Sequence, residues 1–131
     1  MEKLKHIKLG QKSLPIKCDN YVLMEIQENY GTITQFEAEL VGLKPLMDKE
    51  GNPAVNADGK QLFTAVEPSI KAINFVLPLM INEGLEIEAD SRNKPFEPLT
   101  EKEIIRAIDI PYKELSIILH EEFARCFKTK K

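Results

Sequence analysis

The sequence has few of the residues from which catalytic and metal sites are most often built. Its 131 residues include two cysteines, two histidines and six glycines. Cys18 and Cys126 lie far apart and form no CxxC pair, so free thiols in a reducing compartment are expected. The glycines form neither a GxGxxG nor a P-loop pattern, which excludes the common sequence signatures of a phosphate-binding loop.

Long apolar runs are also missing. No stretch approaches the roughly 18 consecutive apolar residues of a transmembrane helix. The lysine-rich N-terminus lacks the apolar segment of a secretory signal. With 43% apolar and 30% charged residues, the composition is typical of a globular protein. We therefore expect a single cytoplasmic domain over residues 1–131, with no membrane partner.

The net charge of −3 is distributed unevenly. Both ends of the chain are rich in lysine, whereas residues 19–50 are predominantly acidic. Basic ends on an acidic body can steer a nucleic acid or favour self-association through complementary faces. Lysine-rich ends are most often simply solvated, so nucleic acid is not the expected partner and self-association stays an alternative.

Hydropathy periods predict a mainly α fold. An alternating pattern at residues 5–18 predicts an N-terminal β-hairpin that turns at residues 10–13, with Pro15 in an edge position. After Asp19 the apolar residues recur at helical spacing. The fold expected is therefore a small five-helix domain with this hairpin at residues 1–18.

Helix boundaries are predicted from caps, glycines and prolines. Thr34 and Thr100, each followed three residues later by glutamate, have the spacing of a capping box. Asp19 or Asn20 is expected to cap the first helix, and Pro68 to lie in the first turn of the third. Asp109 with Pro111 is expected to start the last helix. Helix ends are expected at Gly31, Gly42 and Gly84, although residues 85–89 could continue as helix or strand. Inward-facing side chains of the last helix are expected at Leu115, Ile118, Leu119, Phe123 and Phe127.

Residues 44–66 differ in character. They contain Gly-Asn-Pro and Asp-Gly turn sequences and few large apolar residues before Leu62, which predicts a long mobile insertion or an exposed β-hairpin. The acids Asp48, Glu50 and Asp58 lack the ligand spacing and the closing glutamate of an EF-hand loop, so no calcium site is expected. No internal repeat is apparent in the chain.

The search for catalytic or metal-binding groups finds no constellation. His120 begins the sequence HEEF, but a zinc-binding HExxH motif needs a second histidine where Ala124 stands. His6 lies on the outer face of the predicted hairpin, and neither cysteine has a histidine beside it in the sequence. We therefore expect no enzyme, no catalytic residues, no cofactor and no metal.

The order of several segments resembles the tail assembly chaperones of long-tailed bacteriophages and prophages. The resemblance covers residues 19–40, 70–88 and 97–110, and residues 44–66 are an insertion relative to it. Residues at the family's motif positions are Leu23, Glu25, Ile26, Tyr30 and Gly31; Phe36 and Glu37; Asn82, Glu83 and Gly84; and Leu99, Thr100 and Glu103.

The resemblance implies a function without chemistry. Members of the family bind the long helical tape measure protein, keep it soluble and help tail tube subunits polymerise around it. They act in the cytoplasm of the bacterial host and are not retained in the mature virion. For this chain, the resemblance implies a tape measure protein and a tail tube protein as partners, and no cofactor.

The motif residues all have structural roles, so the resemblance does not identify a binding surface. The contact edge that we expect is formed by Phe123 and Phe127 on the last helix and by the hairpin face around Ile7 and Ile16. Each of these residues is equally suited to the core, and the core is the favoured interpretation.

Two alternative functions remain open. A structural subunit of the tail, such as a completion or connector protein, fits the same composition. Residues 100–125 also resemble a helix–turn–helix DNA-binding regulator in outline. The second of these helices, however, carries only Lys113 near its start, where a recognition helix usually has several donors.

Overall fold

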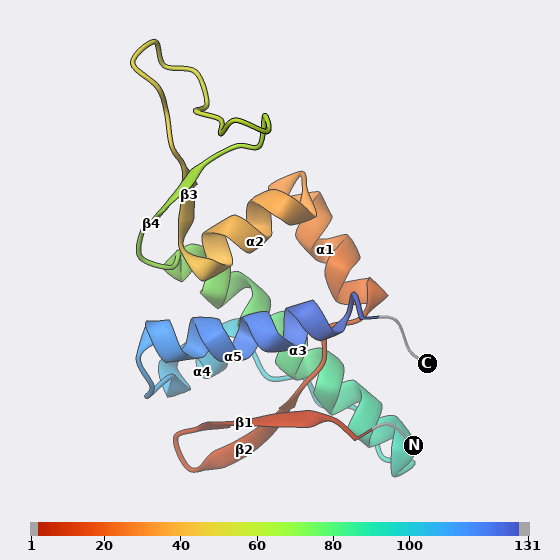
Figure 1. Ribbon diagram of the computed structural model, residues 1–131. Coiled ribbons are helices and arrows are strands. Elements are labelled where there is room, and N and C mark those ends of the chain that lie inside the picture. The colour runs from red at the N-terminus through yellow and green to blue at the C-terminus, as the bar shows by residue number, and fades with distance from the viewer. Residues whose placement is uncertain (1–2, 129–131) are drawn as a thin grey trace.

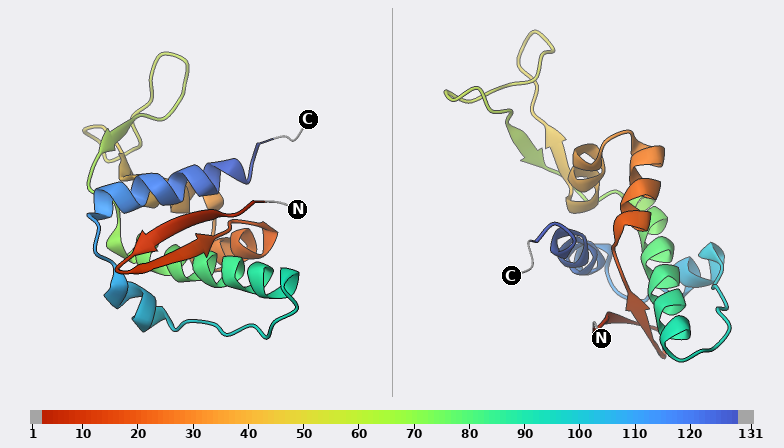
Figure 2. Two further views of the ribbon diagram at one scale, coloured as in Figure 1. Left: turned by 90° about the horizontal axis from the view of Figure 1, so that it is seen from below. Right: turned by 90° about the vertical axis from the view of Figure 1, so that its right-hand side faces the viewer.

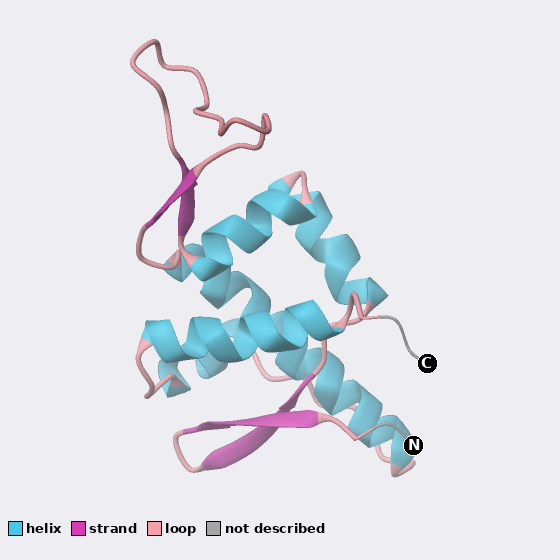
Figure 3. Cartoon of the chain, viewed as in Figure 1, coloured by secondary structure: helices cyan, strands magenta, loops and turns pink. Residues whose placement is uncertain are grey.

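Over residues 3–128, which the computed structural model describes, the chain forms five helices and two β-hairpins (Figure 1 and Figure 3). The predicted mainly α fold with an N-terminal hairpin is confirmed. The elements are β1 (Lys5–Leu9), β2 (Lys12–Ile16), α1 (Asn20–Tyr30), α2 (Ile33–Val41), β3 (Leu43–Pro45), β4 (Phe63–Ala65), α3 (Ile70–Ser91), α4 (Glu101–Ala107) and α5 (Tyr112–Arg125).

Helix α3 lies at the centre of the fold, where it packs against β2 and all the other helices. Its buried face includes Ile73, Leu77 and Met80, which are fully enclosed. Pro78 lies inside the helix and is buried, as the sequence predicts. Because α3 is apolar around most of its circumference, surrounding elements can cover it on several sides.

The N-terminal hairpin packs on α3 through β2, and Lys5 on β1 pairs with Glu121 on α5 at 3.1 Å. Its strands are antiparallel, with His6 opposite Pro15 and Leu9 opposite Lys12, so the turn is shorter than the four residues predicted. Because β2 pairs only with β1, Pro15 lies on an edge as expected. The inward-facing side chains on the two strands are buried: Ile7, Leu9, Leu14 and Ile16.

The predicted end of α3 at Gly84 is wrong, because the helix continues to Ser91. Gly84 is buried beneath β2, and a Cβ placed on it would lie 2.9 Å from the backbone carbonyl carbon and oxygen of Pro15. The glycine therefore permits a close approach of strand and helix, instead of ending the helix.

Three other predicted boundaries need correction. Pro68 precedes Ser69, which caps α3, so it lies outside the first turn of that helix. Helix α2 is capped by Thr32, whose hydroxyl accepts a hydrogen bond from the Gln35 amide at 3.0 Å, and Thr34 lies inside the helix. Asp109 does not cap α5; its carboxylate accepts a hydrogen bond from the Gly10 amide at 3.1 Å and so holds the hairpin turn.

The remaining caps follow the sequence. Asp19 caps α1, and Gly31 and Gly42 end the first two helices. The capping box of Thr100 and Glu103 is complete, with both hydrogen bonds at 3.1 Å. Helix boundaries at the chain surface are thus set by local side-chain chemistry that a sequence reports directly.

Candidate partner-binding surface

The segment from Leu43 to Val66, which we call the arm, projects away from the helices (Figure 1 and Figure 2). All its residues are described, and none of them is buried. Of the twelve large apolar side chains exposed in the described chain, seven lie on the arm. They are Leu43, Leu46, Met47, Val55, Leu62, Phe63 and Val66. Apolar side chains gathered in this way mark an interaction surface more often than a plain solvent face.

The base of the arm is a short antiparallel ladder in which Leu43 pairs with Ala65 and Pro45 with Phe63. This confirms the exposed hairpin that the turn sequences predict. The ladder is held to the helical body by the Val66 amide, which donates to the Gly42 carbonyl at 2.7 Å. Gly42 has a φ of 86°, and a Cβ there would collide with the Val66 carbonyl, so only glycine fits this junction.

The outer part of the arm contains an eight-residue repeat, residues 46–53 and 54–61. Asp48 in the first unit and Asn56 in the second occupy the same place. The side-chain oxygen of each accepts hydrogen bonds of 2.9–3.0 Å from the backbone amides two and four residues later. The expectation that the chain has no internal repeat is therefore wrong.

The two repeat units are joined by a ring of backbone hydrogen bonds. The Leu46 amide donates to Leu62, the Leu62 amide to Ala54 and the Ala54 amide to Leu46, at 2.7–2.9 Å. If the eight residues 47–54 were removed, the pair of Val55 and Gln61 would continue the register of the β3–β4 ladder. The arm is thus a simple hairpin with one additional turn unit inserted into it.

An open groove of about 630 Å³, which we call the arm groove, lies where the arm meets α2 and α5. Its apolar part comes from Val41 and Ala38 on α2, Leu43 and Phe63 on the arm, and Ile117 on α5. Ile117 is 61% exposed although it occupies the middle of a helix. The other lining residues are Thr34, Glu37, Ser116, His120 and Glu121.

Several polar groups of the arm groove already have partners within the protein. Nε2 of His120 lies 2.8 Å from a carboxylate oxygen of Glu37, which joins α5 to α2. The Ser116 hydroxyl donates to the Leu40 carbonyl at 2.6 Å. Because these groups are satisfied, a partner can fill the groove with apolar side chains without losing hydrogen bonds.

The structure separates the four residues predicted as a contact edge. Ile7, Ile16 and Phe123 are buried in the core, whereas Phe127 follows the end of α5 and is 56% exposed. Its expected inward orientation is therefore wrong, although its ring meets that of Phe123 at 5.2 Å between centroids. The arm groove includes none of the four.

Sequence reasoning missed the residues that do gather at the arm groove. Leu43 and Phe63 are twenty residues apart and come together only through the ladder. Ile117 is outside the set of inward-facing residues predicted for the last helix, but nothing in the sequence places it beside Leu43 and Phe63. The available signal was the group of Leu62, Phe63 and Val66 at the end of a segment that had no predicted packing partner.

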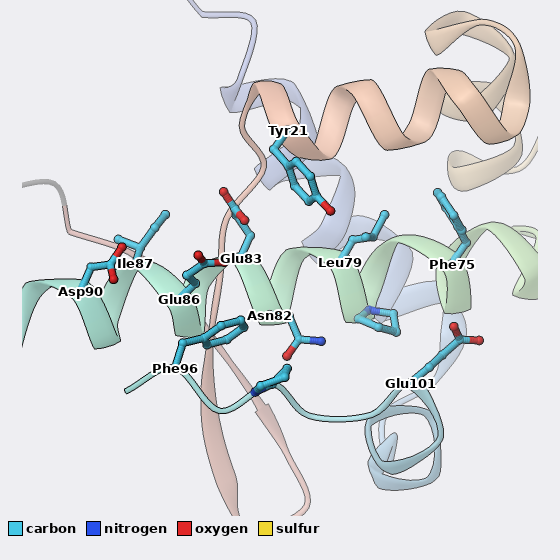
Figure 4. Close-up of a pocket in the computed structure, with 12 residues that line it drawn as sticks. Tyr21, Phe75, Leu79, Asn82, Glu83, Glu86, Ile87, Asp90, Phe96 and Glu101 are labelled. Atoms are coloured by element: carbon cyan, nitrogen blue, oxygen red, sulfur yellow. The ribbon is translucent and has the colours of Figure 1, made fainter. Parts of the chain in front are cut away.

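A second groove, of about 730 Å³, lies between the first turn of α1, the outer face of α3, the linker at residues 92–100 and the start of α4 (Figure 4). We call it the acidic groove. It is lined by Tyr21, Phe75, Pro78, Leu79, Asn82, Glu83, Glu86, Ile87, Asp90, Phe96, Pro98 and Glu101.

Titratable groups elsewhere are arranged in pairs. Nε2 of His6 lies 2.9 Å from a carboxylate oxygen of Glu88. Cys18 and Cys126 are unbridged, and burial together with the neighbouring Cys126 raises the pKa of the Cys18 thiol. Within residues 3–128, no group of three or more His, Cys, Asp and Glu side chains is placed to hold a metal ion.

The buried Glu122 carboxylate links α5 to the chain just before α1. It accepts a hydrogen bond from the Cys18 amide at 2.7 Å and pairs with Arg125, which also donates to the Cys18 carbonyl. Hydrogen bonding to Glu122 raises the pKa of Arg125 despite partial burial. The carboxylate is thus fully used in holding the fold together.

Comparison of the chain with family models, curated proteins and solved structures finds no match in any of the three. In the described part of the chain, no helix combines the length and the apolar character needed to cross a membrane.

Proposed function

We propose that the chain is a tail assembly chaperone that binds a tape measure protein through the arm and the arm groove. The observation that carries the proposal is the arm itself, in which seven large apolar side chains are held in the open by an ordered backbone. The resemblance to the tail assembly chaperones at the helix end at Gly31 and at the capping box of Thr100 and Glu103 supports the same function, whereas Gly84 does not end a helix here.

The proposed contact follows from the chemistry of these surfaces. The tape measure protein that the resemblance implies is a long helical rod, and an apolar stripe along such a rod would make the free protein insoluble. Leu43, Phe63 and Ile117 offer a complementary apolar surface of the helix-in-groove kind. Several copies bound along one rod gain avidity although each contact is small. The protein would act in the cytoplasm of the bacterial host, deliver the rod to tail tube subunits and leave before the virion is complete.

Co-expression with the tape measure protein of the same phage genome tests the proposal. We expect the tape measure protein to move from the pellet to the soluble fraction and to co-purify with the chain. Ile117→Glu should abolish this effect, because it places a charge in the arm groove. Ile70→Glu is the matched control, since Ile70 is also exposed and lies outside both the arm and the groove.

A tape measure protein that stays insoluble at matched expression would contradict the proposal. Equal loss of function with Ile117→Glu and Ile70→Glu would show that the arm groove is not the binding site. Mass spectrometry of purified virions separates the structural alternative: a chaperone is missing from mature particles, whereas a completion or connector subunit is present.

A further inference from the structure

The acidic groove combines an apolar floor with a rim of carboxylates. Pro78 is buried at its base, Phe75, Leu79 and Phe96 are half-buried, and Glu86 and Asp90 on α3 are exposed at its edge. Figure 4 shows Glu86 and Asp90 toward one end of the groove and Glu101 of α4 toward the other. The rim therefore presents negative charge toward both ends of the apolar floor.

The floor is a built feature of the fold. The Asn82 side chain donates to the Leu99 carbonyl and accepts from the Leu99 amide, both at 2.9 Å. These two hydrogen bonds tie the linker to α3 and so hold Phe96 and Pro98 against the groove. A linker fixed in this way keeps the groove open before any partner arrives.

Negative charge at the groove has no cationic counterpart among its lining residues. Four of the described lining residues are acidic, and none of the twelve is Lys, Arg or His. The pKa of Glu83 is raised to about 7, first by its hydrogen bond with Asp19, then by burial, and then by the charges of Asp19 and Glu86. Only Lys17 acts on Glu83 in the opposite direction.

We propose that the acidic groove binds a basic amphipathic helix of a partner protein. Apolar side chains of that helix would lie on Phe75, Leu79 and Phe96, and its lysines and arginines would extend to the carboxylates on both edges. Glu86 and Asp90 are four residues apart along α3, which matches cations spaced along one face of a second helix. This surface is separate from the arm groove, so the inference does not rest on the proposed chaperone function.

Peptide binding tests the inference with defined probes. The probe is a fluorescein-labelled synthetic helix of repeated Leu-Lys-Lys-Leu-Leu-Lys-Leu, and the reference is the same peptide with glutamate in place of lysine. Fluorescence anisotropy should show binding of the lysine peptide at low salt and weakening as salt is raised. The glutamate peptide should not bind.

Matched variants locate the binding site. Glu86→Gln with Asp90→Asn should weaken binding of the lysine peptide about five- to tenfold, the effect of removing two exposed charge pairs. Glu28→Gln with Glu67→Gln removes the same number of exposed carboxylates outside the groove and should change binding less than twofold.

Three results would overturn the inference. One is absence of binding by the lysine peptide, and another is equal weakening by both pairs of substitutions. The third is a dimer in sedimentation measurements that dissociates on Glu86→Gln with Asp90→Asn, because it would assign the groove to a second copy of the chain.

Discussion

The two hairpins of this protein differ in where their apolar side chains lie: those of the N-terminal hairpin are buried, and those of the arm are exposed. In the N-terminal hairpin, Ile7, Leu9, Leu14 and Ile16 point into the core and are buried. In the arm, Leu43, Leu46, Leu62 and Phe63 are all exposed. A two-stranded hairpin is marginally stable alone, so each needs support from elsewhere.

The support differs in kind. The N-terminal hairpin lies on α3, with a backbone hydrogen bond of 3.0 Å from Lys17 to Met80. The arm is held by its junction at Gly42 and by the ring of hydrogen bonds among Leu46, Ala54 and Leu62. Its two turns are held by the side chains of Asp48 and Asn56, which accept hydrogen bonds from backbone amides. Apolar side chains in the first hairpin therefore stabilise the fold, whereas those of the arm are free to contact a partner.

The largest expected effect is the difference between Ile16→Ala and Leu62→Ala. Ile16 is fully buried, so its truncation should lower the free energy of unfolding by about 2–5 kcal/mol. Leu62 is 37% exposed and should change it by less than about 0.5 kcal/mol. Urea denaturation of both variants provides the measurement, and similar losses would show that the arm belongs to the core.

Gly84→Ala tests how closely the N-terminal hairpin lies on α3. The new methyl group would meet the Pro15 backbone, and overpacking of this kind costs about 1–3 kcal/mol. Alanine favours a helix over glycine by about 1 kcal/mol, so the net effect should be a smaller destabilisation. An increase in the urea midpoint would contradict the close approach of strand and helix.

Asp19, which follows the N-terminal hairpin, is hydrogen-bonded to Glu83, and this contact should make the stability of the fold depend on pH. Hydrogen bonding to Asp19, burial and neighbouring carboxylates raise the pKa of Glu83 from 4.5 to about 7. The folded state therefore holds this proton more tightly than the unfolded state between these values, and the free energy of unfolding should fall as pH rises through the window. Glu83→Gln should flatten that slope, whereas a slope unchanged by the substitution would exclude Glu83 as its source.

The smallest expected effect comes from removing residues 47–54. The deletion joins Leu46 to Val55 and leaves one turn unit in register with the β3–β4 ladder. Because none of the removed residues is buried, the free energy of unfolding should change by less than about 1 kcal/mol. Thermal or urea denaturation measures it, and a large loss would mean that the outer arm supports the body.

Local signals in the sequence predicted much of the fold. Asp19 and Thr100 identified helix starts because capping chemistry acts within a single turn. Gly84 misled for a reason that only tertiary structure supplies: its small size is needed by Pro15, which is far away in the sequence. A glycine has the same appearance in a sequence whether it ends a helix or admits a neighbouring strand.

The candidate binding surface was less predictable. Phe123 and Phe127 have the same helical phase to within one position, yet one is buried and the other lies beyond the end of α5. Leu43, Phe63 and Ile117 are brought together by the arm ladder and by the packing of α2 on α5. Such long-range pairing leaves no periodic trace in the residues themselves.

Hydrogen exchange of the chain, free and bound to a tape measure protein, tests the central claim most directly. In the free protein, no residue of the arm is buried, so its amides should exchange faster than those of the N-terminal hairpin. In the complex, the arm at residues 43–66 and α5 around Ile117 should become protected, with the N-terminal hairpin unchanged. A complex in which the arm exchanges as fast as in the free protein would contradict the account.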